Sequence, residues 1–163
     1  GETILALKKS IAVAKKNHTK IAFSLSDSFC VSRHRDDFLE LIANDLDILF
    51  ANESEALELL LKERFSIEIM NNFFANHKKL TAVITRSDKG CVIFKDGKFN
   101  EISTQDVAKI IDTTGAGDAF AAGFLHGLIN EFDLEKSAQL GNKLAGKIIQ
   151  KFGARFSNGE INL

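Results

Sequence analysis

The sequence contains no proline, tryptophan or tyrosine, and 14 phenylalanines are its only large aromatic residues. Without a Pro/Gly-rich stretch, nothing in the chain indicates a linker between domains. Its 163 residues (1–163) are therefore expected to form a single domain, large enough to bury a real core. Only two cysteines occur, Cys30 and Cys91, and their spacing is not that of metal ligands. Both are expected to be packing residues in a protein of the reducing cytoplasm.

An excess of charge of one sign is lacking as well. The chain has 21 Lys and Arg residues and 22 Asp and Glu residues, which gives a formal net charge of −1. This balance excludes a strong electrostatic attraction to nucleic acid or to acidic membranes. No uncharged apolar run approaches the roughly 20 residues of a membrane span, and no signal peptide is visible at the start. With 45% hydrophobic and 26% charged residues, the composition is that of a soluble globular protein.

Two common nucleotide-binding motifs are also absent. No G-x-x-x-x-G-K-[ST] string occurs, which disfavours a P-loop NTPase. No G-x-G-x-x-G follows a strand, and the glycines of residues 115–123 have the wrong spacing for a Rossmann dehydrogenase.

What the sequence does contain is an alternation of amphipathic helices and short apolar strands. A first helix is predicted from the spacing of apolar residues between Ile4 and Ala14. Further helices are predicted over residues 36–43 (capped by Asp36), 52–61, 65–77, 119–128 and 133–151, strands over 20–25, 47–51, 80–86, 91–94 and 98–102, and a polar loop over 26–35. The alternation predicts an α/β fold, a mostly parallel sheet with helices on both faces and an antiparallel hairpin at Asp96-Gly97.

The first residue is Gly1 and the helical pattern begins at once, so we expect the chain to be the carboxyl-terminal part of a longer protein. In parallel sheets, ligands bind outside the carboxyl ends of the strands. The loops that begin at Ser26, Asn52, Thr85 and Asp112 are therefore the candidates for a binding site.

The most informative string is Asp-Thr-Thr-Gly-Ala-Gly-Asp-Ala-Phe at residues 112–120. A β-branched stretch at 107–111 precedes it and predicts a strand, and a helix follows. A helix start offers unpaired backbone N–H groups to an anion, and glycines let a phosphate approach them. The N–H groups of Gly115, Ala116 and Gly117 are therefore expected to bind phosphate.

Asp118 lies in the first turn of that helix. A carboxylate beside a phosphate site is understandable if it takes a proton from an incoming hydroxyl group, which indicates phosphoryl transfer. The alternative is a plain strand-to-helix connection, in which Asp118 only interacts with the helix dipole.

The nine-residue string, followed by Ala122-Gly123, resembles the second signature of the ribokinase-like (PfkB) carbohydrate and nucleoside kinases. The resemblance implies a three-layer ribokinase-like fold, of which this chain would have the carboxyl-terminal half without the amino-terminal half and its stranded lid. It also implies Mg·ATP as the phosphoryl donor, a small nucleoside or sugar as the acceptor, and pairing into a homodimer through the lid.

Several strings, among them residues 26–35 and Gly153-Ala154-Arg155, resemble the bacterial adenosine-kinase-like branch of the family. This resemblance implies that the 5′-OH of adenosine is phosphorylated to give AMP. Two alternatives stay open: a sugar kinase for ribose, fructose or a keto-deoxy sugar acid, and a catalytically silent nucleotide-binding fragment.

The resemblance also assigns nucleotide and magnesium contacts. Asn52 and Glu55 match its N-x-x-E element, in which the Glu organises Mg²⁺ through water; the alternative is a helix cap. Thr85, Ser87 and Gly90 occupy the T-L-G-x-x-G element that lines the ATP phosphates, although Arg-Ser replaces Leu-Gly; the alternative is a plain turn.

The remaining assignments concern a monovalent cation, the adenine base and one unusual loop. Asp112, Thr114, Gly153 and Ser157 resemble the K⁺ loop of the family, and Asn142 lies where many relatives contact adenine, unless it is simply solvated. Two interpretations of the loop over 26–35 stay open. In the first, Asp27 is expected to face the active site while Arg33 supports a phosphate or an acidic neighbour; in the second, the arginines form a solvated basic turn.

Overall fold

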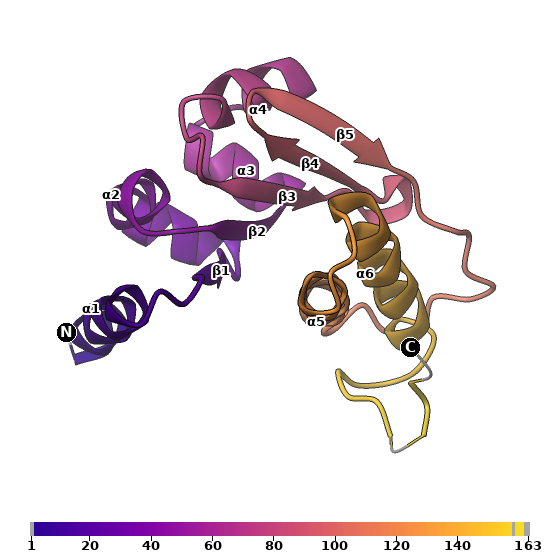
Figure 1. Cartoon of the computed structure of the whole chain (residues 1–163). Helices are drawn as coiled ribbons and strands as arrows, with labels where there is room; N and C mark the ends of the chain where they lie inside the picture. Colours follow the sequence, from indigo (N-terminus) through magenta and orange to yellow (C-terminus); the bar gives the residue numbers. More distant parts are fainter. Residues whose placement is uncertain (1, 158, 162–163) are drawn as a thin grey trace. The chain divides into compact units, whose positions relative to one another are not determined.

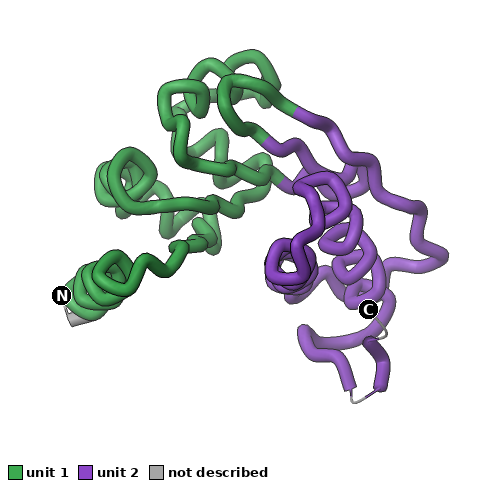
Figure 2. The backbone as a smooth tube through the Cα atoms, in the orientation of Figure 1, with its two compact units in different colours: residues 1–84, 94–99 green, residues 85–93, 100–163 purple. Residues whose placement is uncertain are grey.

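The computed structural model describes residues 2–157 and 159–161 (Figure 1). The chain divides into two compact units, residues 1–84 with 94–99 and residues 85–93 with 100–163 (Figure 2). The elements, in chain order, are α1 (Glu2–Lys16), β1 (Ala22–Ser24), α2 (Ser28–Asn44), β2 (Ile48–Asn52), α3 (Glu53–Leu60), α4 (Ile67–Phe74), β3 (Thr81–Thr85), the 3-10 helix η1 (Ser87–Lys89), β4 (Cys91–Lys95), β5 (Lys98–Ile102), α5 (Ala116–Ile129) and α6 (Leu134–Ile148).

The five strands form one sheet in the order β1-β2-β3-β4-β5, which confirms the predicted α/β class. β1 runs parallel to β2, with Phe23 opposite Leu49. A two-residue turn joins β4 to β5, and both of its residues, Asp96 and Gly97, have positive φ (52° and 72°), as the predicted hairpin requires. The expectation of a buried strand is confirmed for β2 but not for the short edge strand β1, which alternates between exposed and half-buried residues.

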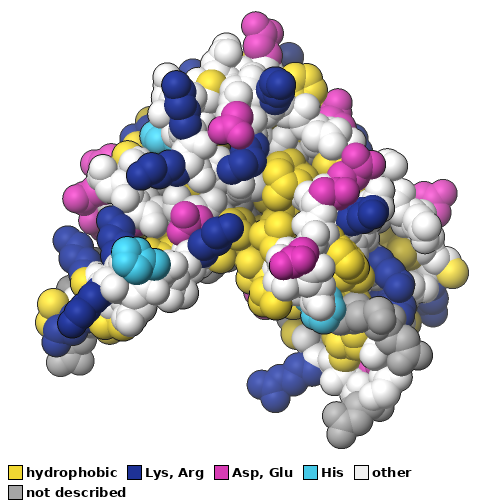
Figure 3. All heavy atoms as spheres, viewed as in Figure 1, with side chains coloured by type: hydrophobic (Ala, Val, Ile, Leu, Met, Phe, Trp, Pro, Cys, Tyr) yellow, Lys and Arg dark blue, Asp and Glu magenta, His cyan; other side chains and the backbone are white. Residues whose placement is uncertain are grey.

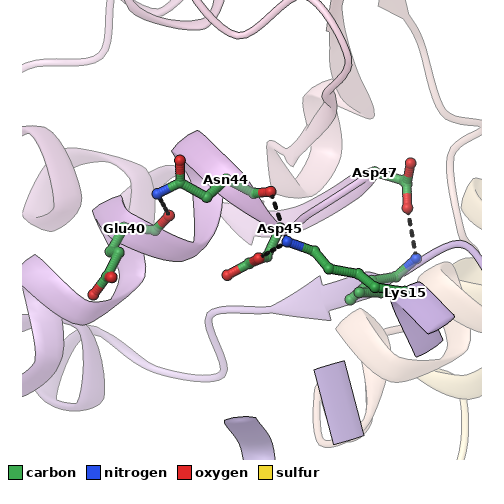
Figure 4. Close-up of polar contacts among 6 residues, drawn as sticks. Lys15, Glu40, Asn44, Asp45 and Asp47 are labelled. Atoms are coloured by element: carbon green, nitrogen blue, oxygen red, sulfur yellow. Dashed lines mark hydrogen bonds and ion pairs between the residues drawn. The ribbon is translucent and has the colours of Figure 1, made fainter. Parts of the chain in front are cut away.

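The helices of the first unit begin where side chains cap them. Asn52 caps α3 and Ser66 caps α4, each accepting a hydrogen bond from an N–H group of the first turn. The carboxyl end of α2 is held by a side chain of α1: Lys15 Nζ donates to Asn44 O at 3.1 Å and pairs with the carboxylate of Asp45 (Figure 4). These contacts attach α1 to the end of α2.

The prediction of a polar loop over residues 26–35 is wrong. α2 begins at Ser28, and its cap is Asp27, whose Oδ1 accepts from Cys30 N–H at 2.7 Å, rather than Asp36. The polar composition of this stretch concealed a helix whose amino-terminal part buries few side chains.

The two interpretations of that stretch are therefore revised. Arg33 is exposed on the helix and its Nε donates to Phe29 O at 3.3 Å, so it is a solvated helical residue. Only Val31 is fully buried in this part of α2, and the backbone departs from helical angles at His34 (φ −125°, ψ 24°).

The prediction of a strand at residues 107–111, before the glycine turn, is also wrong, because residues 103–113 form neither a helix nor a strand. The side chains of Ile110 and Ile111 are 62% and 37% exposed. The N–H groups of Ile111 and Asp112 donate to Ile149 O, at 2.8 and 3.3 Å, instead of to a strand. β-branched residues favour strands only where a neighbouring strand is present to pair with them.

In the second unit, α5 packs closely against α6 through glycines. A Cβ atom at Gly123 would lie 2.8 Å from Leu140 O, and one at Gly141 would lie 2.8 Å from Phe120 O. Neither position has room for a side chain, so the absence of Cβ atoms sets the distance between the two helices.

The surface is of mixed charge, as the near-zero net charge indicates. Figure 3 shows Lys and Arg side chains interspersed with Asp and Glu side chains on the face in view. Within the described residues, no helix combines the length and the apolar character that crossing a membrane would require.

The contact between α5 and α6 yields a stability prediction. Gly123→Ala should lower the free energy of unfolding by about 1–2 kcal/mol, because the overpacking cost exceeds the gain in helix propensity. Urea unfolding measures the change. Gly117→Ala is the control, since a Cβ there has nothing within 4 Å, and equal stability of the two variants would contradict the packing argument.

Candidate functional site

A cavity of about 410 Å³ lies within the unit formed by residues 85–93 and 100–163. Its volume is in the range of small-molecule sites, roughly 300–1,000 Å³. The turn after β3, the irregular segment 104–113, the start of α5 and the second half of α6 form its walls. Six of the residues assigned to the nucleotide site from the sequence line it: Thr85, Ser87, Gly90, Ala116, Gly117 and Asn142.

The turn after β3 has an unusual backbone. Ser87 has a φ of 54° and Gly90 a φ of 81°, and Arg86 N–H donates to Gly90 O at 2.7 Å. A Cβ atom at Gly90 would lie 2.1 Å from Ile102 O, so only glycine fits there. Ser87, where the family pattern has glycine, adopts the left-handed conformation despite its side chain.

The start of α5 is shaped by Gly115. This residue is the N-cap with φ 80° and ψ 5°, and a Cβ on it would lie 2.6 Å from Ala154 Cβ. No side chain of the described residues caps α5. The N–H group of Ala116 donates to Thr113 O at 3.1 Å, so this member of the expected anion site already has a partner.

Gly117 is a helical glycine in the wall of the cavity, and a Cβ there would meet nothing within 4 Å. Neither its φ nor a neighbouring atom requires glycine, although glycine costs a helix about 1 kcal/mol relative to alanine. The bare backbone therefore suits close approach by a ligand. Asp118 follows it in sequence and is exposed in the first turn of α5, but neither Asp118 nor Gly115 is among the residues that line the cavity.

Asp112 connects the signature to the tail of the chain. Its Oδ1 accepts from Thr114 N–H at 2.9 Å, and its Oδ2 accepts from Gly153 N–H at 3.0 Å. Hydrogen bonds from the Thr114 side chain, and then from these two N–H groups, lower the pKa of the Asp112 carboxyl. Hydrogen bonds therefore connect three of the four residues assigned to the cation loop, Asp112, Thr114 and Gly153. The fourth, Ser157, donates its N–H group to Glu160 Oε2 instead.

Asn142 is not a solvated helical residue, because only 8% of its surface is exposed. Its Nδ2 donates to Ser103 O at 3.2 Å and to Ile102 O at 3.5 Å, which ties α6 to the segment after β5. Asn142 also lines the cavity, so it belongs to the wall on which a base is expected to lie.

Asn52 and Glu55 lie in the other unit, where they form the helix cap considered as the alternative reading. Glu55 Oε2 accepts from Asn52 N–H at 2.9 Å and Oε1 accepts from Asn52 Nδ2 at 2.7 Å, while Asn52 Oδ1 accepts from Glu55 N–H at 2.8 Å. Glu55 is 5% exposed. Burial raises the pKa of its carboxyl, and the charge of Asp27 adds to the increase, against the hydrogen bond from Asn52.

The apolar part of the cavity was not predicted from the sequence. Val107, Ile110, Phe120 and Ile149 contribute to its walls. Nothing in their spacing distinguishes them from core residues, and the first two were assigned to a strand. That Val107 and Ile110 lie in an irregular segment and line a cavity is evident only from the folded chain.

Comparison with known proteins identifies the class. A family model described as pfkB family carbohydrate kinase matches residues 5–161. The chain is 36% identical over 123 residues to a cytidine kinase of Thermococcus kodakarensis, an alignment covering 73% of this chain and 42% of that protein. It is 38% identical to the adenosine kinase structure from Sinorhizobium meliloti (TM-score 0.86, covering 92% of this chain and 45% of that one). It is 39% identical to a probable sugar kinase from Rhizobium etli (TM-score 0.83, covering 89% and 43%).

The chain therefore belongs to the pfkB family of carbohydrate kinases, as the resemblance implied. The two structural matches agree with the predicted ribokinase-like α/β fold. The chain spans less than half of the length of these three relatives.

The buried carboxyl of Glu55 gives a pH prediction. A pKa raised in the folded state means that protonation stabilises the fold below the ordinary value of 4.5 and that this stability is lost as the pH rises through the folded pKa. Relative to the Glu55→Gln variant, the wild type should become less stable over that window. Urea unfolding from pH 4 to pH 8 measures the difference between the two; a difference that is constant with pH contradicts the prediction.

Proposed function

We propose that the protein transfers the γ-phosphoryl group of Mg·ATP to a primary hydroxyl group, with the 5′-OH of adenosine as the acceptor and AMP and ADP as products. The observation that carries the proposal is that the turn at residues 85–90 and the start of α5, which no side chain caps, line the same cavity. Asp118 directly follows Gly117, a residue of the cavity wall. The kinases among its relatives support the reaction class.

The cavity accommodates the two ends of a nucleotide differently. The polyphosphate is proposed to lie against Thr85, Ser87 and Gly90 and against residues 115–117, where the N–H groups of Gly115 and Gly117 and the positive end of the α5 dipole favour negative charge. The base is proposed to lie between the apolar residues of segment 104–113 and α6, near Asn142. Helix-end N–H groups that are fixed before the reaction need no reorganisation as charge develops, which is the main source of rate in such transfers.

Asp118 is proposed as the general base. Its carboxylate takes the proton of the acceptor hydroxyl, the oxygen forms a bond to the γ-phosphorus, and the bond from that phosphorus to the β,γ-bridging oxygen breaks to release ADP. The exposure of Asp118 beside Gly117 leaves room for an acceptor molecule. A positioned base of this kind contributes about 10²–10⁴ to the rate.

Glu55 is proposed to hold Mg²⁺ through water. Both of its carboxylate oxygens accept hydrogen bonds from Asn52, and each keeps a lone pair for a metal-bound water. When bound, Mg²⁺ neutralises phosphate charge. Mg²⁺ usually keeps several waters and binds few carboxylates, so a single Glu is chemically sufficient.

A monovalent cation, K⁺, is proposed at the loop of Asp112, Thr114 and Gly153, with Ser157 close in sequence. The carboxylate of Asp112 keeps its charge there because the hydrogen bonds it accepts favour the ionised form.

The acceptor is the second question. Adenosine is favoured by the loop strings and by the likeness to an adenosine kinase, while the likeness to a probable sugar kinase favours a sugar. The candidate sugars are ribose, fructose and a keto-deoxy sugar acid. ADP release by the protein from its complete gene, measured with each acceptor, separates these candidates. Turnover with adenosine alone supports the proposal, turnover with a sugar alone replaces the acceptor, and ATP binding without any turnover indicates a silent nucleotide-binding module.

The role of Asp118 is tested by Asp118→Asn. The amide cannot accept the hydroxyl proton, so kcat should fall by about 10²–10⁴ while ATP affinity changes little. Steady-state kinetics and ATP titration are the measurements. Turnover within tenfold of the wild type, by the same assay, contradicts the assignment.

Gly117→Ala tests the anion site separately from the fold. A methyl group there fills the space that the phosphate is proposed to occupy, so ATP affinity should fall at least tenfold, or about 1.4 kcal/mol. The melting temperature should stay the same or rise, since the Cβ meets no protein atom within 4 Å. Unchanged ATP affinity in a stable variant contradicts the placement of the phosphates.

A further inference from the structure

Two walls of the cavity, the turn at residues 85–90 and the segment 104–107, are separated in sequence by the β4–β5 hairpin. They approach each other at the end of β5. Gly90 lies against the backbone there, since a Cβ on it would be 2.1 Å from Ile102 O and 2.8 Å from Thr104 N. The position of the turn relative to residues 102–104 therefore sets the width of the cavity at this side.

An ion pair spans the same two segments. Arg86 Nη1 donates to Glu101 Oε2 at 3.0 Å, from the second residue of the turn to the residue before Ile102. The Arg86 side chain is 14% exposed and that of Glu101 is 54% exposed. Arg86 is not among the residues that line the cavity, whereas its neighbours Thr85 and Ser87 are.

The turn needs such a support. Two of its residues, Ser87 and Gly90, have positive φ, and for serine this conformation costs roughly 1 kcal/mol or more. Backbone hydrogen bonds from Arg86 N–H to Gly90 O and from Gly90 N–H to Ser87 O close the turn. These bonds fix the shape of the turn but do not connect it to β5. The ion pair between Arg86 and Glu101 provides such a connection.

We propose that the Arg86–Glu101 ion pair positions the turn at residues 85–90 in the nucleotide site, so that both residues control ATP affinity without touching the nucleotide. The inference rests on the proposed function, because it takes the cavity to be the ATP site. It concerns the position at which this chain has arginine where the family pattern has leucine. Arg86 and Glu101 are positioning residues for nucleotide binding.

The test compares Arg86→Met, Glu101→Gln and the double variant by titration with Mg·ATP, together with kcat and KM. Each single change should raise the ATP dissociation constant by roughly two- to fivefold, the range of partly exposed ion pairs. The double variant should lose less affinity than the sum of the two single losses, because both single changes break the same contact. KM for ATP should rise while kcat at saturating ATP is retained. Arg86→Lys should restore binding, since the pair uses a single N–H donor.

Lys15→Met is the matched control, because it breaks the ion pair with Asp45 in the other unit (Figure 4). It should leave the ATP dissociation constant unchanged. Two results overturn the inference: unchanged affinity in both single variants, or additive losses in the double variant. A wild type that does not bind ATP contradicts the proposed function itself, whereas a wild type that binds ATP with unaffected variants contradicts only the positioning role.

Discussion

The close approach of the chain's tail to the start of α5 is the constraint on which the rest of the site depends. Gly115 adopts a left-handed conformation, and a Cβ atom on it would lie 2.6 Å from Ala154 Cβ and 2.9 Å from Ala154 Cα, so the position requires glycine for both reasons. Asp112 completes the contact by accepting one hydrogen bond from Thr114 N–H and one from Gly153 N–H. Since the turn is fixed on both sides, the first turn of α5 presents Gly117 to the cavity in a defined orientation. The proposed anion site at this helix end depends on that arrangement.

The chemistry of the unit follows from the different character of the cavity's walls. Glycines and helix-end N–H groups suit a charged group, while Val107, Phe120 and Ile149 suit a flat, largely apolar one. A nucleoside triphosphate has both parts in one molecule. The role of Asn142 in the cavity wall is structural, since its amide group donates hydrogen bonds that connect α6 with the end of β5. The buried Glu55 carboxyl combines a helix cap with a raised pKa, so a nearby cation would favour its ionised form.

Local sequence patterns predicted most of the fold, and the errors occurred where the structure depends on contacts between residues far apart in the sequence. The β-branched run at β3 and the Asp96-Gly97 turn identified their elements because propensity and tertiary structure agree there. The start of α2 was missed because its residues are polar and its buried side is narrow. Residues 107–111 were assigned to a strand because propensity does not report whether a partner strand exists. The signature at 112–120 gave the polar half of the site, whereas the apolar half comes from residues without a distinctive pattern.

The central claim is that the polyphosphate of ATP binds at the start of α5, beside Asp118. A crystal structure of the complete protein with Mg²⁺ and a non-hydrolysable ATP analogue tests it most directly. We predict terminal phosphate oxygens within hydrogen-bond distance, about 2.7–3.2 Å, of the N–H groups in the first turn of α5, with the base between segment 104–107 and α6. Phosphates bound elsewhere, with the start of α5 solvated, would contradict it.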